Sequence, residues 1–153
     1  MALSVGTTAP DFTLTDQNGN DVSLEKFRGQ PVLVVFIPAA FTGVCQGELC
    51  ELRDTPAPFD AQGVQVLAIT CDPKPVLKEW ATAQGYGFPL LSDFWPHGAI
   101  AEAYGVFNAD LGIATRGSFL IDSQGTIAAV IESTNLGVAR PMDDYQAALA
   151  QLS

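Results

Sequence analysis

The stretch Pro31-Val-Leu-Val-Val-Phe-Ile-Pro-Ala-Ala-Phe-Thr-Gly-Val-Cys45 joins a predicted strand to a predicted helix. Its first part, residues 31–37, is a continuous run of mostly β-branched and aromatic residues, a pattern typical of a strand buried on both faces of a sheet. Pro38 ends this strand, and a helix is predicted over residues 44–59. Cys45 is therefore expected in the first turn of a helix that follows directly on a central strand.

Strand and helix patterns alternate on both sides of this stretch. Two hairpins are predicted, with strands at residues 12–15 and 22–24 and at residues 118–121 and 126–131. The other predicted elements are a strand over 66–70, a helix from Pro73 to Gly85, a strand over 90–92, a helix over 99–104 and a helix over 143–152. This order predicts an α/β fold of the thioredoxin-like arrangement, in which helices flank a mixed central sheet. A single domain spanning residues 1–153 is expected.

Composition excludes several classes of protein. Apolar residues make up 48% and charged residues 16% of the chain, which is incompatible with disorder. The net charge of -10 gives no electrostatic basis for binding nucleic acid or an anionic membrane surface. The longest apolar run, residues 31–41, is too short to span a bilayer, and the N-terminal segment lacks the pattern of a secretion signal. A cytoplasmic protein with reduced thiols is therefore expected.

Cys45 is the candidate nucleophile. Unpaired backbone N–H groups and the helix dipole favour a negative charge in the first turn of a helix, so this position favours the thiolate. Thr42 is the predicted N-cap and brings its hydroxyl to the same helix terminus, while Pro38 fixes the turn and removes one backbone donor. Because nucleophilicity falls as a thiolate becomes more stable, such a site must also stabilise the transition state.

These residues resemble a known family. Pro38-Ala-Ala-Phe-Thr-Gly-Val-Cys45 matches the Pro-x-x-x-Thr-x-x-Cys signature of peroxiredoxins. Within that family the chain is most similar to the one-cysteine alkyl hydroperoxide reductase E group of actinobacteria. The similarity lies in the segments at residues 9–14, 41–49, 88–98 and 103–108.

The resemblance implies a thioredoxin-like fold, no metal or organic cofactor, and hydroperoxides as substrates. It implies that Cys45 is the peroxidatic cysteine and that Pro38, Thr42 and Arg116 support it; Arg116 is assigned through the segment Arg116-Gly-Ser-Phe-Leu-Ile-Asp122. It also implies a homodimer. The aromatic loop Phe94-Trp95-Pro96 supports this expectation, because large apolar side chains in loops often form interfaces. The reductant would be thioredoxin, a mycoredoxin or glutaredoxin-like protein, or a low-molecular-weight thiol.

Cys50 departs from the one-cysteine pattern. The spacing Cys45-Gln-Gly-Glu-Leu-Cys50 resembles the bacterioferritin-comigratory, or Q-type, peroxiredoxins, in which the resolving cysteine lies five residues after the peroxidatic one. On an intact helix, residues five apart are separated by about 7.5 Å of rise and about 140° of rotation, so a disulfide requires unwinding. Gly47 lowers the cost of unwinding. A one-cysteine mechanism remains the alternative.

Other polar candidates have simpler interpretations. Glu48 either joins the pocket's hydrogen-bond network or faces solvent. Cys71 is expected to be a structural thiol, and His97 a loop residue rather than a base. A zinc site is disfavoured because the three cysteines form no Cys-x-x-Cys pair. A redox sensor with little turnover and an inactive thioredoxin-like module are the alternative functions, and steady consumption of peroxide would distinguish an enzyme from both.

Overall fold

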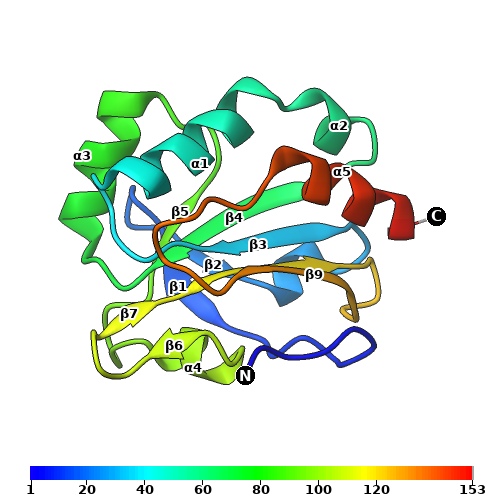
Figure 1. The fold of residues 1–153 in the computed structure, drawn as a ribbon, viewed down its shortest axis with the longest axis horizontal. Helices are drawn as coiled ribbons and strands as arrows, with labels where there is room; N and C mark the ends of the chain where they lie inside the picture. The colour runs from blue at the N-terminus through cyan, green and yellow to red at the C-terminus, as the bar shows by residue number, and fades with distance from the viewer. Residues whose placement is uncertain (153) are drawn as a thin grey trace.

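Strand β3 (Val32–Phe36) lies within a mixed sheet that runs through the protein (Figure 1). The computed structural model describes residues 1–152, and in these residues the sheet has seven strands in the order β2-β1-β5-β4-β3-β8-β9. The other six are β1 (Thr13–Thr15), β2 (Asp21–Ser23), β4 (Gln65–Thr70), β5 (Leu90–Ser92), β8 (Arg116–Ile121) and β9 (Ile127–Ser133). A separate ribbon pairs β6 (Phe107–Asn108) with β7 (Ile113–Ala114).

Alternation along β3 explains its position. Side chains of successive residues point to opposite faces of a sheet, so a strand that is apolar throughout must be covered on both faces. The side chains of residues 32–37 enter two separate hydrophobic cores in turn, with Leu33, Val35 and Ile37 in one and Val32, Val34 and Phe36 in the other. This strand therefore contributes side chains to the core on each face of the sheet.

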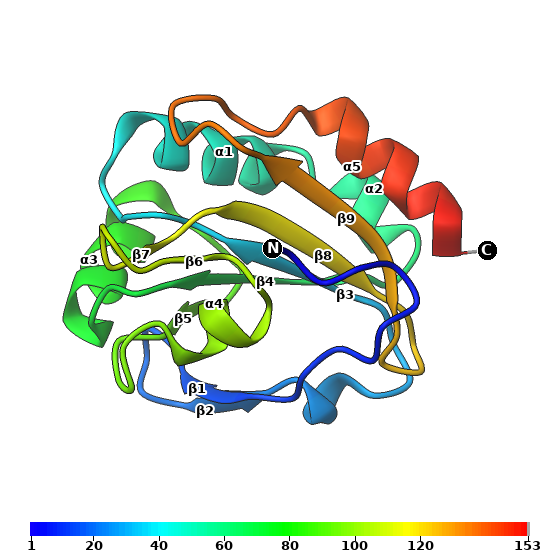
Figure 2. The same ribbon diagram turned by 60° about the horizontal axis from the view of Figure 1, so that its bottom comes forward.

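The helices occupy two layers (Figures 1 and 2). They are α1 (Gly43–Asp54), α2 (Ala57–Asp60), α3 (Lys74–Gln84), α4 (Ala99–Ala103) and α5 (Met142–Leu149), with 3-10 turns at Glu25–Phe27 and Ala150–Leu152. Helices α1, α2, α3 and α5 cover one face, and α4 and the N-terminal segment cover the other. Since β3, β4 and β5 are parallel, the helices that connect them, α1 and α3, both start at the carboxyl ends of these strands.

Most predicted elements are confirmed. Both hairpins, the strands over 66–70 and 90–92 and the helix ending at Gly85 are present, and Gly85 adopts the left-handed conformation that ends a helix. The ribbon of β6 and β7 was not predicted, and the last helix becomes a 3-10 turn after Leu149.

The prediction of one helix over residues 44–59 was wrong. Helix α1 ends at Asp54, and α2 is a separate short helix. Thr55 precedes Pro56, whose ring disfavours helical backbone angles at the preceding residue, and Thr55 indeed leaves the helical region with φ -126° and ψ 59°. The break turns α2 away from the axis of α1.

None of the helices in residues 1–152 has the length and apolar character needed to cross a membrane.

Candidate active site

Cys45 lies in the first turn of α1, next to the carboxyl end of β3, and its side chain is 1% exposed. Thr42 is the N-cap, so Cys45 is the third residue of the helix, as the sequence predicted. No acidic residue lies in the first turn of α1 to offset the positive end of the helix dipole. Cys45 therefore lies at the positive end of the helix dipole.

The hydroxyl of Thr42 takes a different partner from the one expected of a cap. It makes no hydrogen bond to the N–H groups of α1; its Oγ1 donates to the carbonyl oxygen of Ala39 at 2.7 Å. A hydroxyl has one proton and two lone pairs. With the proton committed to Ala39, the oxygen of Thr42 can act towards the site only as an acceptor.

The connection between β3 and α1 is held in a fixed shape. Pro38 is buried two residues after the end of β3, and the backbone N–H of Ala40 donates to a carboxylate oxygen of Asp72 at 2.8 Å. Phe41 has φ 60°, a left-handed conformation that is strained for an aromatic residue. Strain held in place beside a nucleophile is a recurrent property of functional sites.

Arg116 begins β8 and is 3% exposed. Ser118 lies opposite Val35 in the antiparallel pairing of β8 with β3, so Arg116, two residues earlier, reaches the level at which β3 ends. Its Nε donates to the carbonyl oxygen of Leu136 at 2.7 Å, and its Nη1 donates to Glu48 at 2.6 Å. The third nitrogen of this guanidinium group, Nη2, takes no part in the bonds to Leu136 and Glu48.

Glu48, Arg116 and Arg140 form a buried charged cluster beside Cys45. Glu48 lies one turn after Cys45 and is 5% exposed. Its Oε1 accepts from Arg116 and, at 2.9 Å, from Nη2 of Arg140; its Oε2 accepts from the backbone N–H of Arg140 at 2.7 Å and from Nε at 2.9 Å. The remaining nitrogen of Arg140 donates to the hydroxyl of Ser118 at 3.0 Å.

The charges of this cluster do not cancel. Two guanidinium groups face one carboxylate, which leaves one positive charge in a buried site. This charge lies near Cys45 and can stabilise negative charge that develops beside it during a reaction. Burial acts to raise the pKa of Glu48, but hydrogen bonds and charges from Arg140, with the charge of Arg116, lower it below its usual value. Glu48 is therefore an anion at neutral pH.

The cluster decides one open question and adds one residue. Glu48 belongs to a buried hydrogen-bond network with Arg116 and Arg140 and does not face solvent. Arg140 was not predicted, although it is 1% exposed and makes four of the hydrogen bonds. The available signal was a single basic residue in an acidic C-terminal segment, Arg140-Pro-Met-Asp-Asp144, and that signal alone does not indicate burial.

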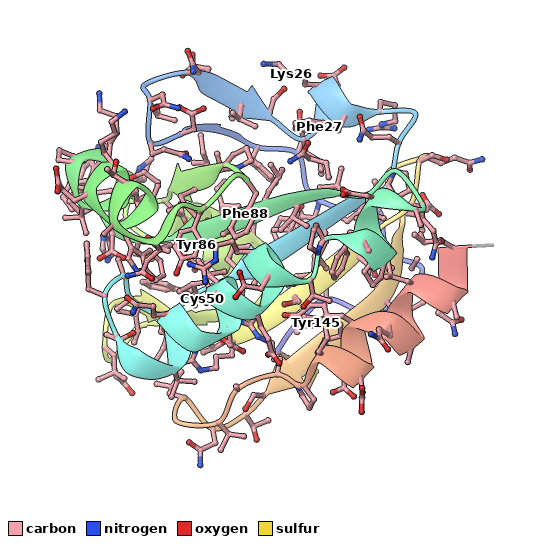
Figure 3. All side chains as sticks on the ribbon, turned by 90° about the horizontal axis from the view of Figure 1, so that it is seen from above. Lys26, Phe27, Cys50, Tyr86, Phe88 and Tyr145 are labelled. Carbon is pink, nitrogen blue, oxygen red and sulfur yellow. The ribbon has the colours of Figure 1, made fainter. Side chains whose placement is uncertain are left out.

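Cys50 lies on α1 but is not brought together with Cys45. It is half-buried, and its Sγ lies 3.6 Å from Oε1 of Gln84 and 3.6 Å from the hydroxyl of Tyr86. In Figure 3, Cys50 and Tyr86 lie towards α3, whereas Tyr145 lies on the other side of α1, towards α5. All three cysteines are free thiols.

Cys71 and His97 fit their structural interpretations. Cys71 is buried, and burial, with the nearby charge of Asp93, raises the pKa of its thiol to about 11, so it stays protonated. The ring nitrogens of His97 lie 3.1 Å from the carbonyl oxygen of Phe94 and 2.7 Å from that of Gly112, so the ring is held within its own loop region. Within the described residues, no group of three or more His, Cys, Asp and Glu side chains is arranged to hold a metal ion.

Comparison with known proteins gives a consistent result. The model of the AhpC/TSA family matches residues 5–130. The chain is 52% identical over 152 residues to alkyl hydroperoxide reductase E of Mycobacterium tuberculosis, covering 99% of each sequence. It is 40% identical over 136 residues to the putative peroxiredoxin bcp of Haemophilus influenzae, covering 85% of this chain and 86% of the relative.

Solved structures are similar as well. The crystal structure of peroxidoxin BcpB from Mycobacterium tuberculosis superposes with a TM-score of 0.82 and 32% identity, covering 97% of this chain and 95% of the other. AhpC of Enterococcus faecalis superposes with a TM-score of 0.88 and 28% identity, covering 98% and 92%.

Proposed function

This chain belongs to the AhpC/TSA family, and we propose, from that membership and from the site, that Cys45 is its peroxidatic cysteine. It is a peroxiredoxin with a thioredoxin-like α/β fold, and therefore a thiol-dependent peroxidase. The observation that carries the proposal for Cys45 is its position at a helix N-terminus beside a buried cluster with one excess positive charge. Neither Cys50 nor Cys71 has such surroundings.

In the proposed first step, the thiolate of Cys45 attacks one oxygen of a hydroperoxide. An S–O bond forms while the O–O bond breaks; the sulfur becomes a sulfenic acid, and the departing alkoxide takes up a proton to leave as an alcohol, or as water when the substrate is hydrogen peroxide. Negative charge therefore moves from sulfur to the departing oxygen. Donors that face this oxygen accelerate the reaction more than donors that face sulfur alone.

The hydrogen bonds that the site residues already make determine which of them can donate to the peroxide and which can accept from it. The N–H groups of Arg116 available to donate to the peroxide are those of Nη2 and the second N–H of Nη1, because the single N–H of Nε is bonded to Leu136 and one N–H of Nη1 to Glu48. The oxygen of Thr42 accepts the hydrogen of the peroxide's O–H, because its own proton is committed to Ala39. Pro38 is buried in the turn before α1 and has no N–H that could compete for the peroxide. No cofactor takes part in this scheme.

We propose that the sulfenic acid is then resolved by Cys50. The two side chains form a disulfide and release water, and an external thiol reduces the disulfide: thioredoxin, a mycoredoxin or glutaredoxin-like protein, or a low-molecular-weight thiol. Since both cysteines lie in one helix, part of residues 43–50 must unwind first. In the alternative one-cysteine route, the external thiol attacks Cys45 directly.

Replacing Cys45 tests the assignment of the nucleophile. Cys45→Ser should abolish consumption of hydrogen peroxide and cumene hydroperoxide with dithiothreitol as the reductant, with unchanged circular dichroism. Cys71→Ser is the matched control and should retain turnover, because Cys71 stays protonated. A Cys45→Ser protein that still consumes peroxide would contradict the proposal.

We also propose a homodimer, a cytoplasmic location and a single domain over residues 1–153. Large apolar side chains are exposed near the carboxyl ends of β3 and β5, namely Phe41 at 53%, Phe94 at 47% and Trp95 at 79%. An exposed aromatic group of this kind suits an interface beside the site. Free cysteines suit a reducing compartment. Light scattering at micromolar concentration should give a dimer, and a monomer mass would contradict this.

A further inference from the structure

The surroundings of Cys50 differ from those of an ordinary half-buried thiol, because two polar groups meet its sulfur. Oε1 of Gln84 and the hydroxyl of Tyr86 each lie 3.6 Å from Sγ, within the range of hydrogen bonds to sulfur. An amide oxygen can only accept, so the S–H of Cys50 donates to Gln84. The thiol has no second proton, and the hydroxyl of Tyr86 must therefore donate to the sulfur.

Tyr86 is held rigidly in this role. It is 6% exposed; its ring stacks on Phe88 with centroids 5.4 Å apart and meets Trp80 edge to face at 5.3 Å. Figure 3 shows Tyr86 and Phe88 beside α1, with Cys50 near Tyr86. Burial, followed by the hydrogen bond to Cys50, raises the pKa of Tyr86, so the phenol keeps its proton. A fixed, protonated phenol is a donor at every physiological pH.

The helix around Cys50 is anchored by buried leucines and by a hydrogen bond to the end of α3. Leu49 and Leu52 are buried at 0% and 4% exposure, and Nη1 of Arg53 donates to the carbonyl oxygen of Gln84 at 2.6 Å. Both glycines of α1, Gly43 and Gly47, lie in its first five residues. Since glycine is a poor helix former, residues 43–47 are the part that unwinds at least cost.

These observations decide which thiol moves. If residues 43–47 unwind, Cys45 is carried to Cys50, and Cys50 stays in contact with Gln84 and Tyr86. The donor on Tyr86 then faces the attacking sulfur throughout the reaction. As Cys50 loses its proton, negative charge develops on its sulfur, and a hydrogen bond to a charged acceptor is stronger than one to a neutral acceptor.

We propose that Tyr86, assisted by Gln84, is a positioning residue for resolution: it holds the sulfur of Cys50 in place and stabilises the charge on it while Cys50 attacks the sulfenic acid of Cys45. The inference rests on the proposed function of both cysteines. The attack forms the S–S bond and breaks the S–O bond; the hydroxyl of the sulfenic acid leaves as water with the proton of Cys50.

Tyr86→Phe removes only the donor and tests the inference. After one equivalent of hydrogen peroxide, followed by acid quenching and mass spectrometry, oxidation of Cys45 should keep its rate, and the disulfide should form about tenfold more slowly. In excess peroxide, more Cys45 should reach the sulfinic acid, because resolution competes with a second oxidation. In a Cys45→Ser background, Tyr86→Phe should also slow alkylation of Cys50.

Tyr104→Phe is the matched control. It removes another buried tyrosine hydroxyl, one that donates to the carbonyl oxygen of Pro10 at 2.7 Å in the opposite core, so it reproduces a loss of stability without touching α1. Gln84→Ala, which keeps the phenol, should slow disulfide formation by a smaller factor and provides a test if Tyr86→Phe does not fold.

The outcomes distinguish a failure of the role of Tyr86 from a failure of the proposed function on which it rests. Equal disulfide rates in Tyr86→Phe and Tyr104→Phe, or a faster rate in Tyr86→Phe, would overturn the role of Tyr86 and leave the proposed function standing. A parent protein that accumulates the sulfenic acid with a free Cys50 would overturn the resolving role and this inference with it. A parent protein in which Cys45 resists peroxide would overturn the proposed function itself.

Discussion

The two halves of helix α1 present their cysteines to opposite kinds of surroundings. Cys45, at 1% exposure, lies at the helix N-terminus beside a cluster of full charges, two guanidinium groups and one carboxylate. Cys50 is half-buried; its sulfur contacts the neutral amide of Gln84 and the neutral phenol of Tyr86, and the guanidinium of Arg53 lies near enough to interact with it electrostatically. One cysteine of this helix thus lies beside a buried charged cluster, and the other contacts neutral groups with one partly exposed guanidinium nearby.

The difference matches the two reactions proposed for these cysteines, which need different kinds of stabilisation. Breaking an O–O bond transfers a full charge to the departing oxygen, and fixed charges stabilise such a transition state strongly in a buried site. Attack on a neighbouring sulfenic acid is intramolecular, so position contributes much of the rate and a single donor supplies the rest. Changes to the charged cluster are therefore expected to alter the reaction rate of Cys45 and to leave that of Cys50 unchanged.

The largest effect is expected where the cluster itself is broken. Glu48→Gln keeps the shape of the side chain but leaves two buried guanidinium groups without an anion, which should lower the free energy of unfolding by about 3–5 kcal/mol. Glu51→Gln makes the same change at an exposed position of the same helix and should have little effect. Urea unfolding of both variants measures the difference, and equal losses would mean that the cluster is not a source of stability.

The loss of unfolding free energy in Glu48→Gln should be large near neutral pH and small in acid. The pKa of Glu48 is lowered in the folded protein, so its contribution to stability is present above the pKa of the unfolded chain, about 4.3, and is lost as the pH falls through the lower folded value. The gap between the parent and Glu48→Gln should therefore be constant near neutrality and close as acid protonates Glu48. A gap that stays open in acid would show that charge is not its origin.

A smaller effect, on rate alone, is expected at Arg116. Arg116→Ala should slow the reaction of Cys45 with peroxide by about 100-fold, because a donor to the departing oxygen is lost. Alkylation of Cys45 by iodoacetamide, in which no O–O bond breaks, should fall much less, and alkylation of Cys50 should not change. Arg28→Ala removes an exposed arginine that contacts the carbonyl oxygen of Gln124, and it serves as the control. Equal losses against both reagents would remove the distinction between the two thiols.

Local sequence patterns predicted most of the fold because its decisive features are local. The apolar run at residues 31–37 had to be buried on both faces, and the structure divides it between two cores. Gly85 and the hairpin turns act within a few residues of the chain. The helix break at Pro56 is equally local and was missed because the apolar pattern continues to Phe59 across it. The β6–β7 ribbon has only two residues per strand, too few for a period to appear.

The site was predictable only where a motif marks it. Thr42 and Cys45 share one turn of helix, so their proximity followed from the sequence, whereas Arg116 required a family resemblance. Arg140 reaches Glu48 from 92 positions away, through packing of the loop that precedes α5, and no local pattern encodes such a contact. The partner of the Thr42 hydroxyl was likewise decided by the shape of the loop, because Oγ1 could have bonded either the helix or Ala39.

The smallest effect tests which half of α1 moves. Gly47 is exposed, lies between the two thiols, and has open space where a Cβ would be added, so Gly47→Ala should fit without strain. Alanine favours the helix by about 1 kcal/mol over glycine, and unwinding residues 43–47 should cost that much more. Disulfide formation after one equivalent of peroxide should therefore slow about fivefold, while the initial oxidation of Cys45, which occurs on the wound helix, keeps its rate. Thr82→Ala improves helix propensity at an exposed position of α3 and should change neither rate, which separates the local effect from general stabilisation. Since the added methyl group touches neither sulfur, a disulfide rate equal to that of the parent would mean that residues 43–47 stay wound and that Cys50 leaves Tyr86 to reach Cys45.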